Sequence, residues 1–411
     1  MHSRFALLVT TVALAAQTTQ QPVRSVTDPG VVTTRQSITP AGVPSVFQGR
    51  VYGVTFGSSS SEVWVLGASH VYRMDWKTNR VLERVAIQGA PGLQGIRYHE
   101  AGRRALVAAA VQPSRKVGLL SVGDGLAKPL AVNLGTQIAG ALAIAGNTAV
   151  VPLIYNNQLA VVDLDAGTVK GTVPTGIAPF GAAGDKAGKV AYVTNWGGRA
   201  PLPNDLTAPT GYAKDADRVV VDSRGIAATG TVSRVDLSSF SVTHTIPVEL
   251  HPTAILWDEP RHRLYVANGN KDSISVIDDR QNRVVQTISL QPFGVKVSGV
   301  APTALAISPD GALLYTACGG INAIAVVNTA KGGVEGLIPT AWYPNGLAVS
   351  ADGKYIAVSS LLGAGSGWRE APAKRYVHAY RGSVSVIDAP DAAQLASYFP
   401  AQKCQPNAED F

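Results

Sequence analysis

Apolar residues come in short runs of strand length, separated by turn-forming residues. Residues 264–290, LYVANGNKDSISVIDDRQNRVVQTISL, contain three apolar runs with Gly, Asn, Asp and Arg between them. Similar phrases stand at 191–199 (AYVTNWGGR), 230–248 and 314–340. Such runs predict antiparallel strands, because the residues between them favour tight reversals of the chain. The recurrence of the phrase indicates an internal repeat.

One repeat is complete in residues 302–340, where the runs PTALAIS, LLYTAC, AIAVVN and VEGLIPT predict four strands. A four-stranded unit that recurs about every 40 to 50 residues is typical of a β-propeller blade. A lone blade would expose two apolar faces, so blades must stack around an axis to bury them. The repeat therefore predicts an all-β propeller of four-stranded antiparallel blades.

The inner strands of the blades can be counted along the chain. They begin near residues 51, 93, 138, 178, 251, 301 and 343, which predicts seven blades. After the third strand of the last blade, at 382–389, the segment PDAAQLASYF suits a short helix capped by Asp391. The outer strand of blade seven must then come from elsewhere. We expect the β-branched N-terminal segment 31–42 to supply it and so close the ring.

The N-terminus has the pattern of a secretory signal peptide. A basic start, an apolar core from Phe5 to Leu14 and small residues around Ala16 predict cleavage near Ala16. Further along, the chain has no apolar stretch of about 20 residues, so membrane insertion is not expected. We expect a signal peptide at 1–16, a flexible segment at 17–30, the propeller at 31–390, and a short helix with a tail at 391–411. The mature protein is expected to be secreted or periplasmic.

Composition changes this picture little. The chain has 411 residues, of which 46% are hydrophobic and 15% charged, and a formal net charge of +7. The Lys and Arg residues are scattered through turns, without a basic helix or an aromatic and basic stripe. A solvated basic surface explains the charge better than nucleic-acid binding, which we do not expect.

Several motifs carry a family resemblance. YVTN at 192–195, YVAN at 265–268, SPDG at 308–311 and SADG at 350–353 resemble the YVTN-repeat β-propellers of bacteria and archaea. Residues 170–400 resemble more closely the propeller that precedes an alkaline-phosphatase-like phosphoesterase domain in bacterial two-domain proteins. That resemblance implies a neighbouring metal-dependent catalytic domain. In this sequence, only 12 residues follow Phe399.

The sequence has no pattern typical of a catalytic or metal site. The histidines of the mature chain form no ligand pair at helical or strand spacing, and no nucleophile elbow appears. These histidines are His70, His99, His244, His251, His262 and His378. We therefore expect no catalytic residue, metal or cofactor. An enzyme with a site built from distant loops at the channel mouth stays open as a further alternative.

The topology of a propeller predicts which rim carries a binding surface. The loops that lead into each inner strand (leading loops) lie on the same rim as those that join the second strand to the third (bridging loops). Two long bridging loops, 197–229 and 361–381, should rise from this rim, whereas the opposite rim carries short turns such as SPDG and DEPRH. Long loops on a rigid frame favour binding. The candidate residues are Phe180, Trp196, Arg199, His251, Trp342, Tyr343, Arg369, Lys374 and Arg375.

Most of these residues also have a structural interpretation. Trp342 and Tyr343 suit packing between blades at least as well as a ligand platform. His251 suits a structural histidine. Asn195 and Asn268 are expected to close tight turns, because Asn tolerates positive φ and bonds to its own backbone.

The second long insertion is basic. Arg369, Lys374, Arg375 and Arg381 outnumber the acidic Glu370. The stretch is either a solvated loop or a dock for an anionic partner.

The two cysteines, Cys318 and Cys404, either form a disulfide between blade six and the tail or stay apart, because sequence does not show whether the geometry is met.

The sequence thus predicts an exported, non-catalytic binding or interaction module. Its expected partners are a phosphoesterase domain, another exported protein or an acidic polymer. The alternative, implied by the resemblance, is the propeller half of a phosphoesterase whose catalytic domain is missing from this chain or encoded separately.

Overall fold

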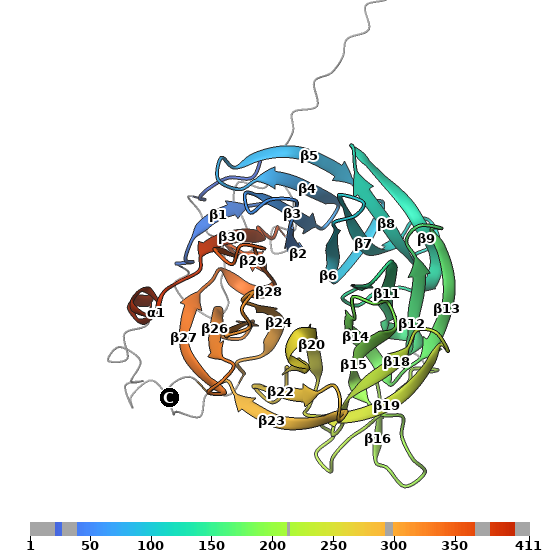
Figure 1. The fold of residues 1–411 in the computed structure, drawn as a ribbon. Helices are drawn as coiled ribbons and strands as arrows, with labels where there is room; N and C mark the ends of the chain where they lie inside the picture. The colour runs from blue at the N-terminus through green and yellow to red at the C-terminus, as the bar shows by residue number, and fades with distance from the viewer. Residues whose placement is uncertain (1–20, 27–38, 212–213, 292–298, 366–378, 399–411) are drawn as a thin grey trace, which may run out of the picture.

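Seven four-stranded antiparallel sheets surround a central axis, so the chain folds as the predicted seven-bladed β-propeller (Figure 1). The computed structural model describes residues 21–26, 39–211, 214–291, 299–365 and 379–398. In blades one to six, the strands run from the axis outward in chain order. Every inner strand counted from the sequence is present.

The strands of blades one to four are β2 (Val51–Phe56), β3 (Glu62–Gly67), β4 (His70–Asp75), β5 (Arg80–Ala86); β6 (Gly89–His99), β7 (Arg104–Val111), β8 (Lys116–Gly123), β9 (Leu126–Thr136); β10 (Ala143–Ala145), β11 (Thr148–Leu153), β12 (Gln158–Asp163), β13 (Thr168–Pro174); and β14 (Ile177–Gly184), β15 (Val190–Gly198), β18 (Gly230–Asp236), β19 (Ser241–Val248).

Those of blades five to seven are β20 (Pro252–Asp258), β21 (Arg263–Asn268), β22 (Ser273–Asp278), β23 (Arg283–Ser289); β24 (Pro302–Ile307), β25 (Leu313–Cys318), β26 (Ala323–Asn328), β27 (Gly333–Pro339); and β28 (Trp342–Val349), β29 (Tyr355–Gly363), β30 (Ser383–Asp388), β1 (Val43–Val46). Outside the blades lie β16 (Thr207–Pro209), β17 (Arg218–Val220), the 3-10 turns η1 (Ile154–Asn156) and η2 (Glu259–Arg261), and the helix α1 (Ala392–Tyr398).

The core lies between the blades. All residues of β11 and β22 are buried, because neighbouring blades cover both faces of a middle strand, whereas the outer strand β23 is mostly exposed. One apolar cluster joins Leu106 of blade two to Leu142 and Val151 of blade three. Each blade therefore buries its faces only by stacking on the next, as the repeat predicted.

An N-terminal strand closes the ring, but it is not the predicted segment. β1 pairs with β30 from Val43↔Val386 to Val46↔Ser383. The predicted range 31–42 ends just before it, and residues 31–38 lie outside the described residues. The strand contains Pro44, which has no N–H to donate to a sheet. It is tolerated because residue 46, on the same side of β1, directs its N–H away from β30, to the Val23 carbonyl at 2.8 Å.

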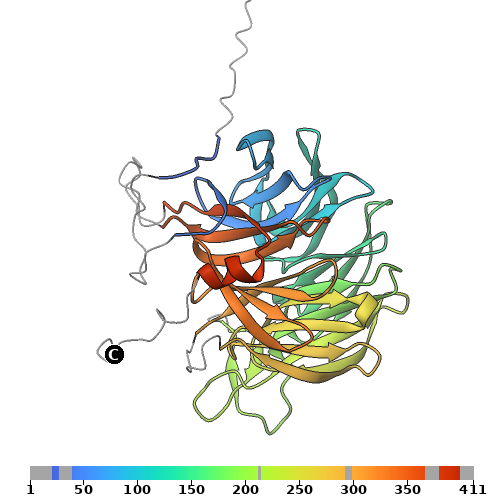
Figure 2. The same cartoon turned by 60° about the vertical axis from the view of Figure 1, so that its left-hand side comes forward.

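The predicted helix is α1, which packs outside the ring on β27 (Figure 2). Asp391 caps it, since its Oδ1 accepts the Gln394 N–H at 2.8 Å. Leu395 is buried where Gly336 of β27 leaves room, because a Cβ at Gly336 would lie 2.6 Å from the Leu395 Cγ. No helix among the described residues is long and apolar enough to cross a membrane.

Asn195 and Asn268 do not have the predicted role, because neither side chain bonds to its own backbone. The Asn268 carbonyl does accept the Lys271 N–H at 3.1 Å, so this residue begins a tight turn. Neither has a positive φ, and both are fully buried, Asn268 as the last residue of β21 and Asn195 within β15. The Asn268 Nδ2 donates to Ser273 Oγ at 3.1 Å and to Ser275 Oγ at 2.9 Å on the third strand. Asn195 bonds in the same way to Thr231 and Ser233. A buried amide needs such partners, so these residues link two strands across the sheet.

Cys318 occupies the equivalent position in blade six. It is fully buried, and burial raises the pKa of its thiol to about 12. Cys404 lies outside the described residues, so a disulfide between the two stays a prediction.

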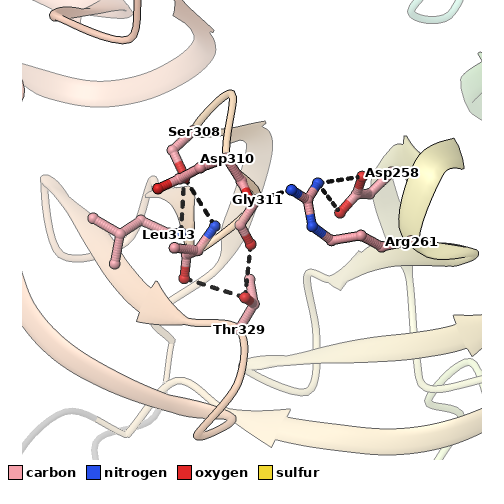
Figure 3. Close-up of polar contacts among 8 residues, drawn as sticks. Asp258, Arg261, Ser308, Asp310, Gly311, Leu313 and Thr329 are labelled. Atoms are coloured by element: carbon pink, nitrogen blue, oxygen red, sulfur yellow. Dashed lines mark hydrogen bonds and ion pairs between the residues drawn. The ribbon is translucent and has the colours of Figure 1, made fainter.

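Short turns on the rim opposite the bridging loops (the turn rim) are held by their own polar residues (Figure 3). In the SPDG turn, the Asp310 carboxylate accepts the Ser308 hydroxyl and the Ala312 N–H, and Ser308 Oγ accepts the Leu313 N–H at 2.9 Å. Arg261 of the preceding blade pairs with Asp258 at 3.0 Å and donates to the Asp310 carbonyl. These polar groups therefore satisfy one another and join neighbouring blades.

Candidate binding site

A recurrent contact holds three leading loops, those of blades four, six and seven, to the bridging loop of the preceding blade. A residue with positive φ stands directly before the proline of the inner strand, and its N–H donates to an Asn or Asp that also has positive φ. The pairs are Ala178 with Asn157, Ala301 with Asp272, and Tyr343 with Asn322, each with an N···O distance of 2.9 Å. Leading and bridging loops therefore share one rim (the loop rim), as the topology predicted.

Blade four departs from the repeat after its proline. The residue after this proline is Thr253 in blade five, Thr303 in blade six and Asn345 in blade seven, and each side chain donates to a carbonyl of the next blade. Blade four has Phe180 at this position. Thr194, on the second strand, makes the inter-blade bond instead, to the Thr253 carbonyl at 2.9 Å.

A second departure lies on the neighbouring strand. The residue after Asn195 is Trp196, whereas Asn268 and Cys318, which pair with the corresponding prolines, are followed by glycines. In blade six, Tyr343 lies over this glycine, since a Cβ at Gly319 would be 3.3 Å from the Tyr343 ring. Blade four therefore has an indole where blades five and six have a glycine that leaves room for the next leading loop.

These departures produce a three-ring stack of Phe180, Trp196 and His251. The Phe180 and Trp196 ring centroids lie 4.1 Å apart at 20°, and those of Trp196 and His251 lie 4.8 Å apart at 14°. Phe180 is buried, and the other two are half-buried. The Trp196 Nε1 is buried and has no acceptor among the described residues. Burial lowers the pKa of the His251 imidazole, so it is neutral at pH 7.

The first insertion begins where β15 ends and contains its own ion pair. Arg199 donates twice to the Asp205 carboxylate, at 2.6 and 3.0 Å, and these bonds lower the pKa of Asp205 to about 2. The same carboxylate accepts the Leu202 N–H at 2.7 Å. The ion pair of Arg199 and Asp205 therefore holds together the first residues of the insertion. Further along, β16 and β17 pair as a short hairpin.

The hairpin and blade three form the walls of a cavity of about 290 Å³. Trp196 and His251 line this cavity, and so does Asp217, which directly precedes the hairpin strand β17. The Asn157 Nδ2 donates to Asp217 Oδ2 at 2.8 Å, which ties the hairpin to the bridging loop of blade three. The lining residues are Ile154, Tyr155, Asn157, Ile177, Ala178, Trp196, Gly197, Thr210, Asp217, Val219, Ala227 and His251.

The structure brings only some of the predicted site residues together. Phe180, Trp196 and His251 stack, whereas Trp342 is buried with 8% exposure and serves packing. Tyr343 lies half-buried over blade six. The basic candidates, Arg369, Lys374 and Arg375, lie outside the described residues.

Tyr155, Asn157 and Asp217 also line the cavity and were not predicted. Asn157 follows the second strand of blade three, at the place where Asp272 and Asn322 follow theirs, so aligning the repeats would have found it. Nothing in the sequence marks Asp217, because it is separated from Asn157 by 60 residues.

Among the described residues, no group of three or more His, Cys, Asp or Glu side chains is placed to hold a metal ion. The cavity itself contains one carboxylate and one imidazole among its lining residues. Its other lining residues are apolar or aromatic, apart from the Asn157 amide and the Thr210 hydroxyl, and this mixture is suited to binding.

No protein-family model matches the chain, and no curated protein matches it. Among solved structures, it is similar to one described as Kuenenia stuttgartiensis Hydrazine Synthase. The TM-score is 0.60 and the identity 14%, over 87% of this chain and 99% of that chain. Identity this low shows the fold alone. Together with the ring of seven blades, this likeness shows that the chain has a β-propeller fold.

Proposed function

We propose that the protein is an exported, non-catalytic binding module that holds its ligand or partner on the loop rim. The observation that carries this proposal is the cavity at blades three to five, where Phe180 and Trp196 break the blade repeat and an insertion adds a wall. The repeat does not require an aromatic ring at these positions, since blades five and six stack without one. Such a position is available for function.

Exposed apolar side chains on the loop rim support the proposal. Ile138, Tyr155, Leu202, Leu206 and Ile226 are exposed, and all stand in loops of blades three and four or in the insertion. A gathering of exposed apolar groups on one rim is typical of an interaction surface.

A second cavity of about 550 Å³ opens on the same rim between blades two and three, beside Arg115 and Gln137. On the turn rim, by contrast, the charged residues of Figure 3 bond to one another and to the backbone.

Replacing residues 201–227 with a short Gly-Ser linker tests the proposal. The ring should stay folded, because these residues form no blade strand, whereas binding of small ligands or of an exported partner should be lost. Binding is measured by melting-temperature shifts over a ligand panel and by partner capture. A ligand or partner held equally well by the linker variant would overturn the proposal. So would phosphate-ester hydrolysis that copurifies with the protein and disappears with a chelator.

Export is proposed from the sequence of the N-terminus. Expression in a bacterium with a secretion pathway should yield a mature chain that begins close to residue 17, as measured by intact mass. An uncleaved chain retained in the cytoplasm would contradict it.

The alternative function, the propeller half of a phosphoesterase, rests on the family resemblance. Its partner would be a metal-dependent phosphoesterase domain supplied by a separate chain. Copurification of such a chain with the wild-type protein, with phosphatase activity only in the complex, would favour this alternative.

A further inference from the structure

We infer that the cavity at blades three to five selects a small organic cation, that is, an ammonium or guanidinium group on an apolar body. This inference rests on the proposed binding function and adds the chemical class of the ligand. It depends on three properties of the cavity: the sign of its charge, its aromatic rings and its size.

Among the described residues, Asp217 is the only charged one that lines the cavity. Its carboxylate is oriented by the Asn157 amide at 2.8 Å. The neighbouring Arg218 does not neutralise it directly, because that guanidinium donates to the Thr207 hydroxyl and carbonyl, both at 2.7 Å, on the paired strand. An anionic ligand would meet this carboxylate without a cation among the lining residues, so the charge favours a cation.

The aromatic lining also favours a cation. Tyr155 is 54% exposed and can offer a ring face to a ligand, whereas Trp196 is the middle ring of the stack and has its faces covered by Phe180 and His251. Aromatic rings attract cations through their negative faces, and they do so more strongly for weakly hydrated organic ammonium groups. His251 adds no repulsion at neutral pH, because burial keeps its imidazole uncharged.

The size and the remaining walls indicate a small ligand with an apolar part. The volume of about 290 Å³ lies near the lower end of ligand pockets, which span roughly 300–1,000 Å³. Ile154, Ile177, Val219 and Ala227 contribute apolar wall.

The test compares choline with its uncharged carbon isostere, in which a tert-butyl group replaces the trimethylammonium group. Both are titrated calorimetrically into the full mature protein, together with benzyltrimethylammonium, acetate and glucose. We expect the two cations to bind and the isostere to bind at least about tenfold more weakly.

Asp217→Asn should weaken binding of choline by about tenfold, because the amide removes the charge and keeps an oxygen for Asn157. The matched control is Asp165→Asn, an exposed carboxylate in the turn between β12 and β13 on the other rim, which should bind choline as the wild type does. Equal melting temperatures of the two variants show that Asp217→Asn is folded. Tyr155→Ala should also weaken binding of choline, because it removes an aromatic ring from the cavity. The variant should stay folded, because this exposed ring contributes little to the core.

Equal binding of choline and the isostere, or no binding of either cation, would overturn the inference. Binding of acetate or glucose that is lost on replacing residues 201–227 would also overturn it, while leaving the proposed function intact. If no ligand or partner depends on those residues, the proposed function itself fails.

Discussion

Replacing Trp196 with alanine removes the middle ring of the stack between blades four and five. Full burial of a Trp makes its replacement by Ala cost about 3–5 kcal/mol, and Trp196 is half-buried, so we expect about 3 kcal/mol. Part of this comes from ring contacts with Phe180 and His251, at 4.1 and 4.8 Å. Each such pair contributes about 0.5–1.5 kcal/mol beyond its buried area.

A double-mutant cycle isolates one of these contacts. Trp196→Ala, His251→Ala and the double variant are unfolded in urea at pH 7.5, and the free energies of unfolding are compared with that of the wild type. The coupling energy between Trp196 and His251 should be about 1 kcal/mol. Trp196→Phe should keep part of it, because it retains a ring. This reasoning would be refuted by a coupling energy near zero, which would mean that the rings lie together without stabilising the blade contact.

Other predictions concern titration, ring closure, the turn rim and the buried thiol. Burial lowers the pKa of His251 in the folded state. Below about pH 6.5, His251 is therefore protonated in the unfolded chain while it is still neutral in the folded chain. Stability should fall over that range, and less steeply in His251→Phe, as followed by urea midpoints. Ser45→Pro should cost about 2–4 kcal/mol more than Ser45→Ala, because only proline removes a ladder N–H between β1 and β30; equal urea curves would contradict this. Gly311→Ala should cost about 1–2 kcal/mol, because φ is 72° and the new Cβ would displace the Arg261 guanidinium; an unchanged melting temperature would refute it. Cys318 should resist thiol reagents at pH 8 until the protein unfolds, as measured by mass in a Cys404→Ser variant.

The sequence by itself determined the architecture. The length of the apolar runs predicts strands, and a Gly, Asn, Asp or Pro at each joint predicts their reversals, because both are local properties of the chain. The inner strands could be counted because four of them open with the same element, a residue followed by proline, at 178, 251, 301 and 343. The rim that carries the insertions also followed from topology alone.

The closing strand and the roles of single polar residues were decided by tertiary structure. Val43–Val46 contains a proline and has no strong strand pattern, yet it pairs with β30, which is more than 300 residues away in the sequence. Asn195 is a residue type that favours turns, but it lies buried within β15 and bonds to Thr231 and Ser233. In both cases the partner comes from a distant segment, so local propensity predicted the wrong role.

The cavity shows the same division. Phe180, Trp196 and His251 could be placed on one rim from the sequence, because each stands at the end of a strand or in a leading loop. Their stacking depends on the angle at which blade four meets blade five, which only the packed ring sets. The contact of Asn157 with Asp217 depends on where the hairpin folds back. The sequence determined which elements form, because their signals are local, and the tertiary structure decided which side chains meet, because packing between distant segments sets those contacts.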